Sequence, residues 1–222
     1  MKHKAILLAV AYLIPSLVLA QRTIYLGALG GLATLSGDGR AAVASSAAAT
    51  SLYDPTNGGA ASLFFGVDVF NYLSFQASYV WNQNNVTLVS TLTGPGAPSF
   101  YRLPALVTQN AFLGNVLVYF RKRSSRIRPY LCEGGGVVHM RSRLEAGGLA
   151  RGGLPLPPAT SAHVSPALRT SVGLDVRLRR GWYFRYSFGE TISRNQFGDQ
   201  LSPPEHRIPK NFQSLFGIYR TF

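Results

Sequence analysis

Long apolar runs, cysteine and acidic residues are all scarce in this chain of 222 residues. Beyond residue 20, no stretch approaches the roughly 18 consecutive apolar residues that indicate a membrane-spanning helix. The single cysteine, Cys132, excludes an intramolecular disulfide. In an oxidising compartment it is either a free thiol or a small buried hydrophobe. Only nine residues are Asp or Glu, against 22 Lys and Arg, so the formal net charge is +13.

The first residues have the pattern of a secretory signal peptide. Two lysines precede an apolar run, Ala5–Leu19, and the small Ala20 follows it. The run is about 15 residues long, which is short for a membrane-spanning helix. We expect cleavage after Ala20, so that residues 1–20 are the signal peptide and residues 21–222 form one domain.

The excess of positive charge points to anionic partners. Because the expected signal peptide directs the chain out of the cytoplasm, nucleic acid is an unsuitable partner. Lipid head groups of the outer membrane and lipopolysaccharide phosphates are more suitable anionic partners. Charged residues are only 14% of the chain and aromatic residues are 12%. This balance is expected when much of the protein surface faces lipid.

Eight stretches of the mature sequence alternate between apolar and polar residues, as strands with one apolar face do. In the sixth stretch, Leu168 and Val172 share the apolar face, and Arg169 and Asp175 share the other face. The alternation predicts an all-β chain. The ranges are residues 22–35, 61–71, 72–82 (with a resumption at 86–92), 107–121, 128–143, 165–179, 182–194 and 210–222.

The connections between these stretches alternate between long and short. This rhythm predicts an eight-stranded antiparallel transmembrane β-barrel, an up-and-down meander in the outer membrane of a Gram-negative-type bacterium. The short turns and both termini would face the periplasm. A soluble secreted barrel or sandwich also alternates, but stretches near ten residues with aromatic ends favour lipid. The long connections are residues 36–60, 83–106, 144–164 and 195–209, and the short ones lie near 71, at 122–127 and at 180–181.

The chain also resembles a known family in three places. The segment 128–136 looks like a Pro-Tyr…Gly-x-Gly strand, the segment 24–31 looks like a Gly-rich first strand, and the chain ends on Phe222. These features resemble the small eight-stranded outer-membrane barrels of the OmpA/OmpX type. The resemblance implies that the barrel-assembly machinery reads Phe222 as its signal. Arg220 interrupts the usual terminal alternation, which leaves a bulge, a frayed end or a snorkelling side chain as explanations.

Charged residues on the polar faces of the strands predict a cluster inside the barrel. An eight-stranded barrel is only wide enough to be filled by side chains, so these charges would pair and plug it. A narrow polar pore or gate is the alternative. Glu190, His139 and Arg141 are further candidates for the same inward set. The predicted cluster is Asp68, Glu133, Arg169, Asp175, Arg177 and Arg185.

A basic turn is the second candidate site. Arg121, Lys122 and Arg123 lie in one predicted periplasmic connection. Near an anionic lipid surface each such charge contributes about 1 kcal/mol of attraction, so we expect these side chains to contact head groups of the inner leaflet. A solvated turn that blocks wrong insertion is the alternative.

Catalysis and cofactor binding find little support in the sequence. The three histidines of the mature chain, His139, His163 and His206, form no His-Ser-acid arrangement and no metal-ligand spacing. We therefore predict a non-enzymatic barrel without a cofactor, with a structural or interaction role in membrane integrity or surface contact. A small porin-like channel and a lipid-modifying barrel enzyme remain the alternatives. The composition of the long loops does not identify a surface ligand.

Overall fold

The computed structural model describes residues 23–44, 47–96, 98–194, 201–203 and 210–222. The expected signal peptide and its cleavage site lie outside the described residues, as does His206. The described residues contain no helix that is long and apolar enough to cross a membrane. The strands are β1 (Thr23–Leu35), β2 (Asp38–Ala44), β3 (Ala47–Pro55), β4 (Gly58–Asp68), β5 (Leu73–Thr93), β6 (Ser99–Tyr119), β7 (Ile127–Leu144), β8 (Leu149–Arg151), β9 (Thr160–Arg177), β10 (Trp182–Ser193) and β11 (Lys210–Thr221).

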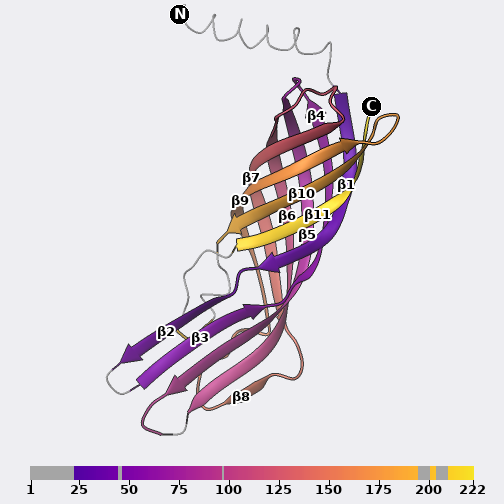
Figure 1. Cartoon of the computed structure of the whole chain (residues 1–222). Helices are drawn as coiled ribbons and strands as arrows, with labels where there is room; N and C mark the ends of the chain where they lie inside the picture. Colours follow the sequence, from indigo (N-terminus) through magenta and orange to yellow (C-terminus); the bar gives the residue numbers. More distant parts are fainter. Residues whose placement is uncertain (1–22, 45–46, 97, 195–200, 204–209) are drawn as a thin grey trace, which may run out of the picture.

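Eight of these strands close into a ring. The antiparallel pairings run β1–β4–β5–β6–β7–β9–β10–β11, and β11 pairs back onto β1, where Leu26 lies opposite Arg220. Figure 1 shows the strands tilted around a common axis, with the start of β1 and the end of β11 at the same end. The predicted eight-stranded antiparallel barrel is confirmed.

The three short connections lie at the end of the barrel where β1 begins, which we call the turn end. One of them is the tight turn at Arg180 and Gly181. Both residues have positive φ angles, 47° and 82°, and the Trp182 N–H donates to the Arg179 carbonyl. Glycine adopts a positive φ without steric cost, which suits the sharp reversal between β9 and β10.

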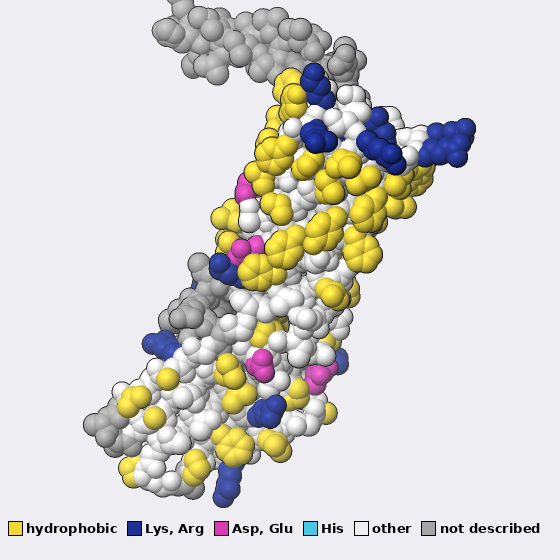
Figure 2. Space-filling model, in the orientation of Figure 1, with side chains coloured by type: hydrophobic (Ala, Val, Ile, Leu, Met, Phe, Trp, Pro, Cys, Tyr) yellow, Lys and Arg dark blue, Asp and Glu magenta, His cyan; other side chains and the backbone are white. Residues whose placement is uncertain are grey.

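The outer wall of the barrel is apolar. Along β10, Phe184, Tyr186 and Phe188 are exposed, whereas Arg185 and Ser187 between them are buried. On the face that Figure 2 shows, hydrophobic side chains gather in a band across this half of the molecule, with Lys and Arg at the turn end. A soluble monomer rarely exposes a continuous apolar surface of this extent, so the band is the lipid-facing wall of a transmembrane barrel.

Two strands continue far beyond the barrel and form what we call the extension. β5 and β6 are 21 residues long each, and their register runs unbroken from Leu73–Val118 to Leu92–Ser99. β3 and β2 add to the β5 side, and the short β8 adds to the β6 side. The expectation that residues 36–60, 83–106 and 144–164 are loops is therefore wrong, because each of them contains strand. Small Ala, Ser and Thr side chains in β2 and β3 hide the alternation that would have marked them.

The extension has a hydrophobic core of its own. Leu201, which follows β10 in the chain, packs into this core. The segment is held by a bond from the Ser51 hydroxyl to the Pro203 carbonyl (2.9 Å) and by one from the Ser202 N–H to Ser90 Oγ (3.3 Å). The barrel mouth is thus covered by apolar side chains. The buried members are Leu35, Tyr53, Val86, Leu88, Tyr101, Val107, Met140 and Leu201.

Candidate functional site: the polar interior of the barrel

An ion pair between neighbouring strands lies inside the barrel. Asp175 of β9 is opposite Arg185 of β10, and their side chains point into the lumen. The Arg185 Nε donates to Asp175 Oδ1 at 2.7 Å, and Nη2 donates to Oδ2 at 2.8 Å. The side chains are 0% and 1% exposed. Two charges buried so deeply are tolerated only when each is paired and its remaining polar groups are satisfied.

Tyrosine and glutamine side chains complete this pair. Tyr119 and Tyr219 donate their hydroxyls to Asp175 Oδ2 at 2.9 and 2.8 Å. The Arg185 Nη1 donates to Gln76 Oε1 at 2.7 Å. The Arg185 guanidinium also lies 4.7 Å from the ring centre of Tyr219, within cation–π range. Residues from β5, β6, β9, β10 and β11 therefore meet in one layer across the lumen.

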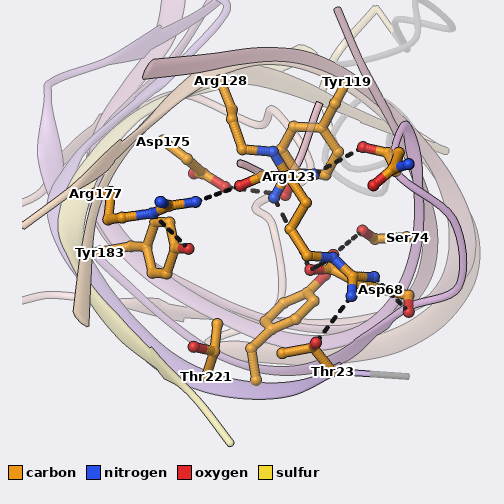
Figure 3. A network of polar contacts seen from close by, with 12 residues as sticks. Thr23, Asp68, Ser74, Tyr119, Arg123, Arg128, Asp175, Arg177, Tyr183 and Thr221 are labelled. Atoms are coloured by element: carbon orange, nitrogen blue, oxygen red, sulfur yellow. Dashed lines mark hydrogen bonds and ion pairs between the residues drawn. The ribbon is translucent and has the colours of Figure 1, made fainter. Parts of the chain in front are cut away.

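A second group of contacts closes the turn end. Asp68, at the end of β4, accepts a hydrogen bond from the Ser74 hydroxyl and pairs with Arg123 Nε at 3.3 Å. The Arg128 Nη1 lies 3.9 Å from the same carboxylate, and its guanidinium carbon is 3.7 Å from the Tyr119 ring centre. Figure 3 shows these side chains converging on the axis of the barrel end.

Arg123 has a different position from the predicted one. It belongs to the turn between β6 and β7, yet its Nη1 donates to Thr23 Oγ1 at 2.9 Å and its Nη2 donates to the Asp68 carbonyl at 3.0 Å. Its side chain is only 25% exposed. The prediction of a head-group contact is therefore wrong for Arg123, because the buried Asp68 attracts this guanidinium into the barrel. Arg121 and Lys122 are exposed.

Arg177 connects the turn to the barrel wall. Its Nε donates to the Tyr183 hydroxyl at 3.1 Å, and its Nη2 donates to the Arg123 carbonyl. Arg177 of β9 therefore binds the Arg123 carbonyl, and Asp68 of β4 binds the Arg123 side chain. Figure 3 shows both arginines reaching across the opening.

Arg169 lies further from the turn end than Asp175 and Arg185 do. Among the described residues it has only neutral partners. It is buried on β9 and donates from Nη1 to the Thr191 hydroxyl (3.2 Å) and to Gln213 Oε1. Arg169 and Arg185 both line an internal void of about 20 Å³. A void of that size holds about one water molecule.

Four residues expected inside the barrel lie outside it. Glu133, His139 and Arg141 are exposed on β7, because the inward positions of this strand are the even ones, such as Cys132 and Met140. The glycines at 134–136 gave no indication of the strand's phase, so the predicted faces were exchanged. Glu133 accepts a hydrogen bond from the Thr170 hydroxyl on the outer wall. The fourth residue, Glu190, pairs there with Lys210 at 3.3 Å.

The end of the last strand is regular. Phe222 and Arg220 both point outward, and the registers of β11 with β1 and β10 contain no bulge. The Arg220 guanidinium lies 5.3 Å from the Phe222 ring centre and 5.8 Å from the ring centre of Trp182. The interruption at Arg220 is therefore a cation placed between two aromatic rings, and the bulge explanation is wrong.

The described residues offer no arrangement for metal binding. They contain no group of three or more His, Cys, Asp or Glu that could hold an ion. Both described histidines of the barrel, His139 and His163, are exposed on neighbouring strands. Cys132 is buried among Leu117, Tyr119 and Tyr130, as a small hydrophobe would be.

Comparisons with known proteins return structures of small outer-membrane proteins. No family model matches this sequence, and no curated protein matches it. The solved structure of Neisserial surface protein A (NspA) has a TM-score of 0.47 and 14% identity, covering 90% of this chain and 97% of that one. OprG from Pseudomonas aeruginosa has a TM-score of 0.48 and 16% identity, covering 91% and 96%. Ail of Yersinia pestis, in complex with the heparin analogue sucrose octasulfate, has a TM-score of 0.47 and 9% identity, covering 90% and 99%.

Proposed function

We propose that this protein is a closed outer-membrane barrel with a structural or surface-contact role and no catalytic activity. Its turn end faces the periplasm, and its extension faces the outside of the cell. Short turns on the periplasmic side and long excursions outside are the common arrangement of such barrels. The observation that carries the proposal is the layer around Asp175 and Arg185, which fills the lumen at membrane level.

Among the residues that the structure describes, side chains occupy the lumen both at the Asp175 layer and at the turn end. Below the Asp175 layer, the guanidinium of Arg123 covers the turn end through Asp68 and Thr23. Above it, the internal void that Arg169 and Arg185 line has room for about one water. Interior side chains are expected to fill an eight-stranded barrel.

The test is planar-bilayer conductance of the refolded mature barrel. We expect a closed membrane, with the protein first shown to be folded by its shifted mobility in unboiled gel samples. Steady open channels of hundreds of picosiemens would contradict the closed barrel. Recovery of the native protein from a soluble fraction would contradict its location in the outer membrane.

One observation favours a narrow anion-preferring channel as the second candidate. Inside the barrel, Arg169 has only neutral partners among the described residues, whereas Arg185 is neutralised by Asp175. A lumen with excess guanidinium would attract anions if the plug opened. The candidate predicts small, anion-selective conductance that decreases in an Arg169→Gln variant.

Lipid contact at the turn end is a further part of the proposal. Arg121 and Lys122 are exposed there, and four other exposed basic residues join them in a collar that suits anionic head groups of the inner leaflet. Arg121→Gln with Lys122→Gln should weaken binding to anionic vesicles and leave folding in neutral lipid unchanged. Unchanged binding to anionic vesicles would contradict this contact. The other members of the collar are Arg126, Arg179, Arg180 and Arg220.

Assembly is the last part. The outward Phe222 would be read by the barrel-assembly machinery before β11 closes on β1. Phe222→Ala should reduce the amount of assembled barrel in cells and leave refolding of the purified chain unaffected. Normal assembly of this variant would contradict the role of Phe222.

A further inference from the structure

A row of basic side chains stands on the outer wall at the far end of β7. His139, Arg141 and Arg143 alternate with the buried Met140 and Ser142, so all three point outward. Alternate residues of a strand are spaced by roughly 6.6 Å. We call these three residues the outer ladder. They lie far from the turn end, on the side of the barrel that carries the extension.

The outer ladder begins where the apolar wall ends. The lipid-facing part of β7 runs from Ile127 to Val137, which matches the roughly 9–11 residues that a tilted strand needs to cross a bilayer. Val164, the β9 residue opposite His139, is 67% exposed, and Leu168 further down β9 is 66% exposed. These two side chains continue the exposed apolar wall of the barrel up to the level of His139. The next positions along β7 therefore fall at the height of lipid head groups.

The surroundings of the outer ladder leave its charges available. Arg141 lies between Thr108 of β6 and Ala162 of β9, and these neighbours are small and uncharged. Among the described residues, neither Arg141 nor Arg143 has an ion-pair partner. Lys210 of β11, by contrast, is paired with Glu190 of β10. Arg141 and Arg143 therefore carry unpaired positive charge at this end of the barrel wall, as the collar does at the turn end.

We propose that the outer ladder binds the phosphate groups of lipopolysaccharide in the outer leaflet. This inference rests on the orientation given under Proposed function, because the opposite orientation would put the outer ladder in the periplasm. Guanidinium groups form bidentate, charge-assisted hydrogen bonds with phosphate oxygens. Two arginines one strand repeat apart can grip a single lipid whose acyl chains lie along Val164 and Leu168. The partner is a phosphorylated lipid and not a soluble ligand, since the apolar wall adjoins the charges directly.

The test is a titration of the refolded barrel in neutral detergent with lipid A that carries its phosphate groups, followed by native mass spectrometry. The double variant Arg141→Gln with Arg143→Gln should weaken this binding by roughly 30-fold, as expected for two charges near a lipid surface. The matched control, Arg102→Gln with Arg151→Gln, removes the same charge from two exposed positions of the extension and should keep the affinity. Dephosphorylated lipid A should bind the unmodified barrel as weakly as the double variant binds the phosphorylated lipid.

Three outcomes would overturn the proposal. The double variant could bind as tightly as the unmodified barrel, the control could lose as much affinity as the double variant, or phosphate removal could leave binding unchanged. The mobility shift of unboiled samples shows whether each variant is folded. Open channels in the bilayer assay would contradict the closed barrel and leave the difference between the two double variants intact, so the two failures are distinguishable.

Discussion

The two ends of the barrel are closed by different chemistry. At the turn end, the carboxylates of Asp68 and Asp175 are surrounded by arginine and tyrosine side chains. At the other end, an apolar cluster that includes Leu88 and Tyr101 fills the space inside the extension. Inside the membrane the apolar side chains are needed on the outer wall, and the alternation of each strand then directs polar ones inward. Beyond the membrane this demand ends, and the strands bury their apolar faces as a soluble sheet does.

The largest effect is expected from Asp175→Asn in the ion-pair layer of the lumen, next to the turn-end contacts. This change leaves the buried Arg185 guanidinium without a counter-charge, and it should lower the free energy of unfolding by about 3–5 kcal/mol. Urea unfolding of the barrel in lipid vesicles measures the loss. The double variant Asp175→Leu with Arg185→Leu removes both charges and should recover most of the stability. If the single change costs nothing, the ion pair does not hold the filled lumen together.

Leu88→Ala tests the other end. Removing this buried side chain should cost about 2–4 kcal/mol because of the cavity that it leaves. The damage should stay in the extension, which would become sensitive to protease while the barrel keeps its shifted mobility in unboiled samples. Loss of that shift would show that the extension and the barrel unfold as one unit.

A smaller effect is expected from Gly173→Ala. Gly173 lies opposite Tyr130, and a Cβ at this glycine would lie 2.2 Å from the Tyr130 Cζ. The ring must move away from its place beside Arg185, at a cost of about 1–3 kcal/mol. Gly135→Ala is the control, since its Cβ would meet nothing closer than 3.7 Å. Equal unfolding free energies for the two variants would contradict the role of this close contact.

The smallest effect is expected from Arg123→Gln. The partly exposed guanidinium bonds to Asp68 and Thr23, and losing these charge-assisted bonds should cost about 1–2 kcal/mol. Arg121→Gln in the same turn should cost almost nothing in neutral lipid. If the two variants have the same stability, Arg123 is an ordinary turn residue and does not fasten the turn end.

The sequence predicted the barrel well because lipid imposes a strict alternation. Each strand of the ring was predicted from its alternation, although the two faces of β7 were exchanged, and the turn at Arg180 and Gly181 followed from its residues. β2, β3 and β8 were missed, because no lipid faces the extension and its small side chains show no regular pattern. β5 is one continuous strand of 21 residues, but its length was not recognised from the sequence. In its second half, Asn and Thr occupy the outer face, where apolar residues would have marked the strand.

The interior was predicted only in part. Asp68, Arg169, Asp175 and Arg185 lie inside as their strand phase required, whereas Glu133 lies outside because a run of glycines concealed the phase of β7. The tyrosines at 119 and 219 were overlooked as network members. Their alternate spacing within β6 and β11 could have placed them inward, but only the three-dimensional register brings both hydroxyls to Asp175.

The seam between β1 and β11 also sets the order of events during biogenesis. Leu26 meets Arg220, so the first strand waits for nearly the whole chain before its second edge is paired. Contacts between such distant residues form slowly, and unpaired edges invite aggregation in the meantime. Closure of the ring is therefore expected to be the slow step of folding, and the edges of β1 and β11 stay open to aggregation until it occurs.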